Sequence, residues 1–383
     1  MSGFTFQTVP EIHCEEGLSG RLHQLLAARF AARSVFIVTD PGIAALGLAD
    51  PAIRGLKDAG YFVTVFDGVS ADPGEHIVLA AAKEADRAEA GIIIGFGGGS
   101  SMDVAKLVAA LASGQQGLGD MYGNDRVTCG RLPLVQMPTT AGTGSEVTSI
   151  SVITTGETTK SAVVSPVLYA DMALLDPALT TGLPREVTAA TGIDAMVHAI
   201  EAFTSATRKN MISDGLALRA LSLLGENLVS VCQEPENMEA RKAMLVGSLL
   251  AGQAFANAPV GAVHALAYPL GGIFHIPHGL SNALVLPHVL RFNKPHAAPL
   301  YAEIAMHLGL KGKDAPTLTD AFITWMEGLI GRTGIERRLR DVGIAEQDLD
   351  RLAREAMLQE RLLVNNPCPV SEADARRIYG VAW

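Results

Sequence analysis

The sequence predicts a chain of two parts, an α/β domain with a parallel sheet over residues 1–183 and an all-helical domain over residues 184–383. In the first half, short apolar segments alternate with helical ones, which is typical of a parallel α/β sheet. From about Pro184 the apolar residues recur with the spacing of helices. A length of 383 residues agrees with two or three domains.

The elements follow from these patterns in chain order. The expected strands of the first half are short apolar runs at residues 34–39, 61–66, 92–96 and 134–137. Helical segments separate them at about residues 51–59, 74–90 and 101–112. In the second half, residues 186–203, 212–231 and 238–256 have helical periodicity, and the remainder also looks helical. Residues 260–272 are rich in glycine and proline, so we expect no long regular helix there.

Composition narrows the class of protein. Hydrophobic residues make up 48% of the chain and charged residues 18%, with a formal net charge of −10, so we expect a globular chain with an ample core. The acidic balance and the scattered lysines and arginines argue against nucleic acid or a membrane as partner. The N-terminus lacks the features of a signal peptide, and the four cysteines form no CxxC motif. We therefore expect a cytoplasmic protein with reduced thiols.

The segment from Ala243 to Leu290 contains no Asp, Glu, Lys or Arg, yet it holds four histidines. These are His264, His275, His278 and His288. A long uncharged segment is usually buried, and buried imidazoles need partners. Prolines and amides interrupt the segment, so it has no clean apolar stretch of ~20 residues to cross a bilayer. We interpret it as protein core.

Asp194 and His198 lie four residues apart, so a helix would place both on one face. Such a pair alone is more often a local hydrogen bond, and core histidines with satisfied partners are the alternative for the downstream set. Together with His264 and His278, however, the pair can enclose a divalent metal. One carboxylate and three imidazoles suit Fe²⁺ or Zn²⁺ better than Ca²⁺ or Mg²⁺. Because Pro and Gly flank the downstream histidines, we expect non-helical backbone to hold them.

Two glycine-containing loops follow predicted strands, at residues 95–103 and 138–146. Glycines let the backbone approach a ligand closely, and a helix N-terminus offers free N–H groups to an anion. The first loop is not a full Rossmann fingerprint, because Ser100 stands at the third glycine position, and a tight turn is the alternative. Two such loops in one sheet favour a dinucleotide at the strand ends.

Asp40 ends the first predicted strand. A carboxylate there can bind the ribose hydroxyls of NAD and repel the 2′-phosphate of NADP. The alternative is an ordinary turn aspartate before Pro41 and Gly42. The residues alone favour that alternative.

Four motifs resemble those of the iron-containing (group III) alcohol dehydrogenases. They are residues 97–106, residues 138–146, residues 192–201, and the pair His264 and His278 followed by Gly279. The resemblance covers nearly the whole chain, including the ending from Asn365 to Trp383. It implies a dehydroquinate synthase-like architecture, with an NAD-binding first domain, a metal-binding catalytic second domain and a homodimer.

The resemblance also implies a role for individual residues. The metal ligands would be Asp194, His198, His264 and His278, usually with Fe²⁺ and with Zn²⁺ as the alternative. The cofactor-binding residues would be Asp40, Asp72, Gly98, Gly99, Ser100, Asp103, Thr139, Thr140, Thr143, Ser145 and Lys160. Within that set, residues 98–100 would bind the pyrophosphate, Asp103 would lie near the nicotinamide, and the residues from Thr139 to Ser145 would line the adenosine and ribose.

The resemblance assigns three charged residues more finely. Lys160 would reach the nicotinamide ribose. Asp40 matches the acid that favours NAD over NADP, which reverses the interpretation as a turn residue. Asp72 stands where many members have asparagine and would lie at the adenine ribose.

One position departs from the family pattern. Many members carry a histidine four residues after the third ligand, proposed to relay protons, and this chain has Tyr268 there. His275, three residues before His278, is the chain's own candidate for that role. A free tyrosine hydroxyl, with a pKa of about 10, is poorly suited to proton transfer at neutral pH. Some relatives acting on hydroxy acids share a tyrosine here, which keeps 4-hydroxybutyrate-like substrates open.

The expected activity is the interconversion of an alcohol and its aldehyde or ketone, by hydride transfer to or from NAD(H). A hydroxy-acid dehydrogenase of the same family is the first alternative. A zinc enzyme similar to glycerol dehydrogenase or dehydroquinate synthase is less favoured, because their ligand sets differ. A non-catalytic metal- or nucleotide-binding protein is the alternative from another class.

Overall fold

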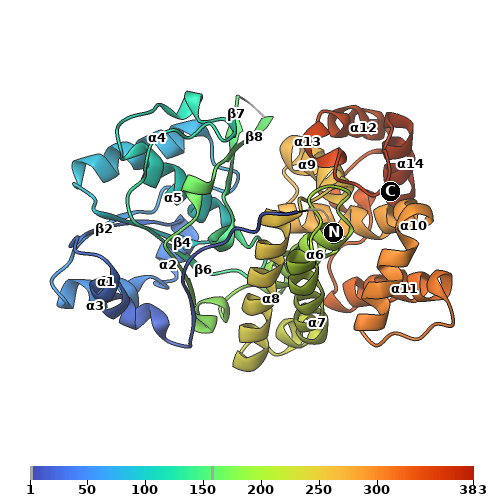
Figure 1. Cartoon of the computed structure of the whole chain (residues 1–383), viewed down its shortest axis with the longest axis horizontal. Helices are drawn as coiled ribbons and strands as arrows, with labels where there is room; N and C mark the ends of the chain where they lie inside the picture. The colour runs from blue at the N-terminus through green and yellow to red at the C-terminus, as the bar shows by residue number, and fades with distance from the viewer. Residues whose placement is uncertain (1–2, 157–158) are drawn as a thin grey trace. The chain divides into compact units, whose positions relative to one another are not determined.

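The computed structural model describes residues 3–156 and 159–383 (Figure 1). The described chain divides into two compact units. One is an α/β unit of residues 7–182, and the other is a helical unit of residues 3–6 and 183–383. The N-terminal residues thus group with the helical unit, although the sequence placed them in the first domain.

A six-stranded parallel sheet forms the centre of the α/β unit, in the order β1-β9-β6-β4-β2-β3. The strands are β1 (Ile12–Cys14), β2 (Ser34–Val38), β3 (Phe62–Phe66), β4 (Ile92–Gly97), β6 (Leu134–Pro138) and β9 (Met172–Leu175). The central strands are buried on both faces, as continuous apolar runs require. The predicted parallel sheet is confirmed, whereas the short strands β1 and β9 were not predicted.

Helices cover both faces of this sheet (Figure 1). They are α1 (Leu22–Arg29), α2 (Pro41–Ala45), α3 (Asp50–Asp58), α4 (Glu75–Arg87) and α5 (Gly99–Leu111). Val35 and Ile37 of β2 and Ile94 of β4 pack against Leu26 of α1 and Leu56 of α3. Because side chains alternate along a strand, the intervening residues face the helices α4 and α5.

A small second sheet was not predicted from the sequence. It contains β7 (Ile150–Thr155) and β8 (Thr159–Val164), which are antiparallel, with β5 (Gly123–Asn124) beside β8. Half of the residues of β7 are serine or threonine, and several of its residues remain partly exposed. Such half-polar strands lack the continuous apolar run that identified the strands of the main sheet.

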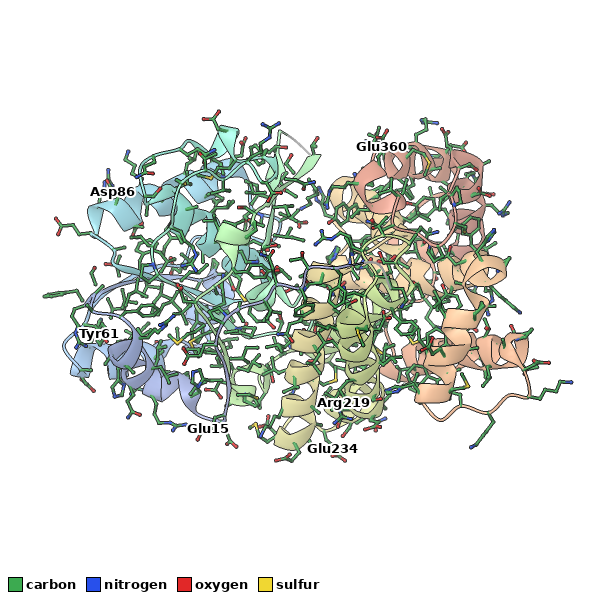
Figure 2. The ribbon with its side chains drawn as sticks, in the orientation of Figure 1. Glu15, Tyr61, Asp86, Arg219, Glu234 and Glu360 are labelled. Atoms are coloured by element: carbon green, nitrogen blue, oxygen red, sulfur yellow. The ribbon has the colours of Figure 1, made fainter. Side chains whose placement is uncertain are left out.

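Nine helices make up most of the described helical unit. They are α6 (Arg185–Thr204), α7 (Met211–Gln233), α8 (Met238–Asn257), α9 (Ala262–Phe274), α10 (His278–His307), α11 (Ala315–Thr333), α12 (Leu349–Met357), α13 (Glu360–Leu363) and α14 (Glu372–Ala382). Helices α6, α7 and α8 pack side by side (Figure 1). Asn210 caps α7, which carries the exposed Arg219 and ends before Glu234 (Figure 2).

The expectation that residues 260–272 form no long regular helix was wrong. Residues 262–274 form α9, with Pro269 inside it. A proline removes one helical hydrogen bond, but nearly every residue of α9 up to Leu270 is buried, and that burial offsets the loss. His264 therefore lies on a helix, and His278 is the first residue of α10. The long helix α10 likewise contains three prolines, Pro287, Pro295 and Pro299.

Most of the uncharged segment from Ala243 to Leu290 is buried within α8, α9 and α10, as expected of core. Of the described helices, α7 alone has the length and composition to cross a membrane, a test that the core helices of soluble proteins also pass. Helices α8 and α9 reach that length and composition only when they are taken together as a pair, and the pair is bent by 106°.

Candidate metal centre and nucleotide site

Four side chains meet in the helical unit. Asp194 and His198 lie one turn apart on α6, and His264 reaches them from α9, with ligand atoms all within 4.8 Å of one another. The Nε2 atom of His264 lies 3.0 Å from Nε2 of His198 and 3.8 Å from Oδ1 of Asp194. The Nε2 atom of His278 lies 3.5 Å from the same Asp194 oxygen. The structure thus brings together all four residues named from the sequence.

The electrostatics of the cluster favour an ionised carboxylate. Burial raises the pKa of Asp194, but the charges of His198, His278 and His264 oppose it, and the pKa is lowered overall. One anionic oxygen and three imidazole nitrogens then converge on one point. This donor set fits Fe²⁺ or Zn²⁺, whereas Ca²⁺ and Mg²⁺ prefer a shell of oxygens.

Glu201 was not singled out from the sequence, although it belongs to the cluster. Its buried carboxylate accepts a hydrogen bond from the backbone N–H of Val263 at 2.7 Å and lies 2.6 Å from Nδ1 of His264. Because Nδ1 donates its proton to Glu201, the lone pair of Nε2 is directed at the cluster. The spacing could have revealed this residue, since positions 194, 198 and 201 share one helix face.

Asn282 is a second residue that the sequence analysis missed. It lies one turn after His278 on α10, and its Nδ2 donates to Asp194 Oδ1 at 2.5 Å. Among the described residues, its buried amide oxygen has no hydrogen-bond partner. The Nδ2 atom of Asn282 also lies 3.4 Å from Nε2 of His264 and 3.3 Å from Nε2 of His278, so its amide group adjoins the atoms that converge in the cluster. The residues present therefore fit the predicted metal.

The two predicted proton-relay residues differ in position. Tyr268 lies one turn after His264 on α9, with its ring centroid 5.9 Å from that of His278. His275 is the exposed C-cap of α9 and has a left-handed backbone with a φ of 58°. Across the described ranges, no hydrogen bond or ring contact involves the His275 side chain. The structure therefore brings Tyr268, but not His275, against a predicted ligand.

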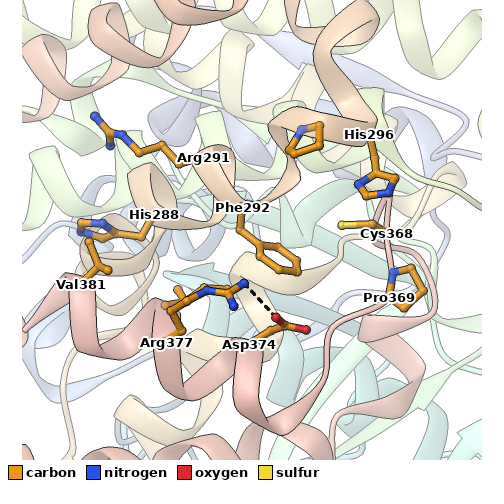
Figure 3. Close-up of a pocket in the computed structure, with 11 residues that line it drawn as sticks. His288, Arg291, Phe292, His296, Cys368, Pro369, Asp374, Arg377 and Val381 are labelled. Atoms are coloured by element: carbon orange, nitrogen blue, oxygen red, sulfur yellow. Dashed lines mark hydrogen bonds and ion pairs between the residues drawn. The ribbon is translucent and has the colours of Figure 1, made fainter.

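The fourth histidine of the uncharged segment lies apart from the cluster. His288 lines a cavity of about 600 Å³ between α10 and α14, beside Arg291, Cys368 and Arg377 (Figure 3). Burial lowers the pKa of His288, and the nearby Arg291 lowers it further. Asp374 and Arg377 form an ion pair at the same cavity.

The predicted nucleotide residues meet at one edge of the main sheet. Strands β2, β4 and β6 are neighbours, and the loops after them carry Asp40, the glycines and Thr139. Helix α5 starts at Gly99 after the N-cap Gly98, with no side chain capping it. Its first N–H groups are therefore available to an anion, as a pyrophosphate site requires.

Unpaired hydroxyls at this edge fit a polar ligand. In the part of the chain that the structure describes, the hydroxyls of Thr39, Ser101 and Thr139 are buried without a hydrogen-bond partner. The two loops also pack closely, because a Cβ atom at Gly99 would lie 2.8 Å from the methyl group of Thr143. Glycine is therefore required at 99 for packing as well as for access of a ligand.

The position of Asp40 is compatible with both roles considered for it, that of a turn residue and that of a ribose-binding carboxylate. Its side chain accepts a hydrogen bond from the backbone N–H of Ile43 at 3.0 Å and so caps α2. Its second oxygen would lie 3.3 Å from a Cβ atom at Gly97, so the carboxylate is beside the glycine loop. The turn role and the position for ribose binding are compatible.

Asp103 and Ser145 contact each other, which the sequence did not predict. The Ser145 hydroxyl donates to Asp103 at 2.6 Å, and the second Asp103 oxygen accepts from Val152 N–H at 2.8 Å. The buried Lys106 donates to Ser145 at 2.7 Å and to Ile150 O at 2.6 Å. Burial lowers the pKa of Lys106, and the charge of Asp103 opposes that shift. This network joins both loops to β7.

Asp72 and Lys160 form an ion pair at 2.5 Å. The resemblance places Asp72 at the adenine ribose and Lys160 at the nicotinamide ribose, which are separate parts of a dinucleotide. The two side chains contact each other in the structure, and their assignments to the two riboses stay predictions. Spacing in the sequence gave no signal for this contact.

Two family models together match most of the chain. Residues 10–177 match the model of iron-containing alcohol dehydrogenase, and residues 188–383 match the C-terminal model of the Fe-containing alcohol dehydrogenase family. Long-chain-alcohol dehydrogenase 1 of Geobacillus thermodenitrificans is 40% identical over 371 residues, covering 95% of this chain and 93% of that protein. The 1,3-propanediol dehydrogenase of Klebsiella pneumoniae is 36% identical, covering 95% and 94%.

Solved structures agree over the full length. A 1,3-propanediol oxidoreductase has a TM-score of 0.96 at 33% identity, with 100% of both chains covered. A sulfoacetaldehyde reductase from Bifidobacterium kashiwanohense, solved in complex with NAD⁺, has a TM-score of 0.88 at 29% identity, covering 100% of this chain and 99% of that one. The predicted dehydroquinate synthase-like architecture is confirmed. The chain is an oxidoreductase and belongs to the iron-containing alcohol dehydrogenase family.

Proposed function

We propose that this protein interconverts an alcohol and its aldehyde or ketone with NAD(H) as the hydride carrier and a divalent metal, Fe²⁺ in preference to Zn²⁺, as the Lewis acid. The observation that carries the proposal is the convergence of Asp194, His198, His264 and His278. A divalent cation held there would polarise a carbonyl and lower the pKa of an alcohol. Glu201 would keep His264 in the required tautomer.

Differences in exposure among the four ligands support one direction of approach for the substrate. The side chains of Asp194 and His264 are 2% and 3% exposed, whereas that of His278 is 41% exposed. A small alcohol or aldehyde would therefore approach on the side of His278 and the neighbouring Tyr268. The other ligands and the packed helices behind them would exclude water from the far side.

The edge of the main sheet supports NAD as the cofactor. The free N–H groups at the start of α5 suit the pyrophosphate, and the unpaired hydroxyls of Thr39 and Thr139 suit polar groups of a nucleotide. The carboxylate of Asp40 beside Gly97 would repel a 2′-phosphate, so NAD(H) is preferred over NADP(H). A relative solved with NAD⁺ adds support.

Proton exchange with solvent would use His275 or Tyr268. His275 would offer an imidazole, a group that commonly carries protons in enzymes, whereas Tyr268 has the more direct contact with His278. The names of the relatives keep the substrate class broad, from long-chain alcohols to propanediol and sulfoacetaldehyde. We also propose a cytoplasmic homodimer.

Metal content tests the proposal directly. Replacing His264 or His278 by alanine should abolish alcohol oxidation and lower the bound metal measured by elemental analysis, because each removes a ligand. His288→Ala is the matched control, since His288 lies in the same uncharged segment but outside the cluster. Full metal content in an inactive His278→Ala protein would show that His278 is not a ligand.

A further inference from the structure

We propose that Arg361, together with Tyr268, binds an anionic group carried by the substrate, so that the preferred substrate is a short alcohol or aldehyde with a carboxylate or sulfonate at its other end. The inference rests on the proposed alcohol–aldehyde chemistry and specifies its substrate class. In the structure, Nη2 of Arg361 donates to the hydroxyl oxygen of Tyr268 at 3.4 Å.

This contact connects the cation to the candidate metal centre. Tyr268 lies one turn after His264, and its ring is 5.9 Å from the ring of His278, the most exposed of the four ligands. The Arg361 guanidinium also lies 6.0 Å from the centre of the Tyr268 ring. The Tyr268 ring thus lies near both the Arg361 guanidinium and the most exposed of the four predicted ligands.

Arg361 has no acidic partner within the described residues, because none of their ion pairs includes it. Arg376 and Arg377 on α14, in contrast, form ion pairs with Asp350 and Asp374. A guanidinium has five N–H donors in a planar fork that matches a carboxylate, and only one is used on Tyr268. The remaining donors are available to an anion.

Hydrogen bonds connect the backbone of Arg361 to the segment that precedes α9. The side chain of Asn365 donates to the carbonyl of Arg361 and to that of Val260, each at 2.9 Å. Arg361 is itself exposed, and so is the preceding Glu360, labelled in Figure 2. A fixed backbone and an accessible head group are what anion recognition needs.

Tyr268 would contribute a second hydrogen bond to the anion. Its oxygen accepts from Arg361, which leaves its own O–H free to donate. A tyrosine and an arginine would then hold the anion while the carbon at the other end of the chain meets the cluster. A neutral alcohol of the same length would lack both interactions, so selectivity follows from the charge of the substrate.

Steady-state kinetics with NADH test this inference. The probes are 4-oxobutanoate with butanal as its neutral match, and sulfoacetaldehyde with propanal. In the wild type the anionic aldehydes should have the lower KM. Arg361→Gln should raise the KM for an anionic aldehyde about tenfold more than the KM for its neutral match, because a charge-assisted bond is lost. Arg361→Lys should restore part of the difference, and Tyr268→Phe should lose a smaller part.

The control is Arg219→Gln, which removes the same charge from an exposed position on α7. Figure 2 shows Arg219 well away from Glu360, the residue before Arg361. This variant should change neither the KM for the anionic aldehyde nor that for its neutral match. Selectivity for only one of the two anionic probes would assign the site to that anion. Equal KM changes for charged and neutral aldehydes, or a wild type that prefers the neutral ones, would overturn the inference.

A calorimetric titration with 4-hydroxybutanoate and with 1-butanol separates this inference from the proposed function. Binding of the acid that Arg361→Gln weakens would support the anion site even if no aldehyde were reduced, in which case the proposed reaction alone would fail. A wild type that bound the acid no better than the alcohol would contradict the anion site.

Discussion

Glu201 has no expected contact with a metal, yet it sets the chemistry of a ligand. Its carboxylate lies 2.6 Å from Nδ1 of His264 and also accepts from Val263 N–H. Glu201→Gln should lower metal affinity about 10- to 100-fold, as is typical when the partner of a ligating histidine is changed. Competition with a chelator measures the affinity, and the exposed Glu239→Gln on α8 is the control. Equal affinity in Glu201→Gln and wild type would remove Glu201 from this role.

Asp40 combines a structural and a recognition role at one residue, and a suitable substitution separates them. Asp40→Ser keeps a side-chain oxygen that can cap α2 but removes the negative charge. We expect the ratio of NADP(H) to NAD(H) activity to rise, because a 2′-phosphate no longer meets a like charge. The kcat/KM values with both cofactors measure this ratio. A wild type that used NADP(H) as well as NAD(H) would contradict the assignment.

At the scale of elements, the end of α9 offers a test of the proton relay. His275 caps α9 with a φ of 58°, a conformation that glycine adopts without strain. His275→Gly should therefore stabilise the fold by about 1 kcal/mol while it removes the imidazole. If His275 relays protons, turnover in alcohol oxidation should fall more at pH 7 than at high pH. A more stable protein with unchanged turnover at every pH would leave Tyr268 or water as the carrier.

The loop after β6 contains a buried acid that links stability to pH. Burial raises the pKa of Glu146 from 4.5 to about 7, although a backbone hydrogen bond and Lys106 oppose the shift. The folded state therefore holds its proton more tightly than the unfolded state. This contribution to stability is fully present below pH 4.5 and is lost as the pH rises toward 7, by roughly 3 kcal/mol in all.

Glu146→Gln stays neutral at every pH, so it should flatten that dependence. Urea unfolding of the variant and the wild type from pH 5 to pH 8 measures the difference between the two proteins. Parallel pH profiles would show that Glu146 does not titrate in this range.

At the scale of the whole molecule, the sequence predicted most of what rests on local patterns. The apolar runs of β2, β4 and β6 and the four-residue spacing of Asp194 and His198 are such patterns. The β7–β8 pair was missed because its strands are half polar. The helix around Pro269 was missed because proline and glycine have a low intrinsic preference for helix. The burial of α9 outweighs that preference.

Contacts between distant segments could not be predicted from one sequence. Lys106 reaches Ile150, Asp72 pairs with Lys160, and Arg361 reaches Tyr268, and no periodicity connects the members of these pairs. Glu201 is different, because its helical spacing from Asp194 was available. The candidate metal ligands could be named in advance, but the side chains that orient them required the structure.

The most direct test of the central claim is the formation of NADH by metal-loaded protein. The protein is loaded with Fe²⁺ without oxygen and mixed with NAD⁺ and a panel of primary alcohols that includes 1,3-propanediol and 4-hydroxybutanoate. We expect NADH absorbance to increase with at least one alcohol, to disappear when a chelator removes the metal, and to return when Fe²⁺ is restored. NADH formation at the same rate in metal-free protein, or none with any alcohol in protein shown to hold metal, would contradict the account.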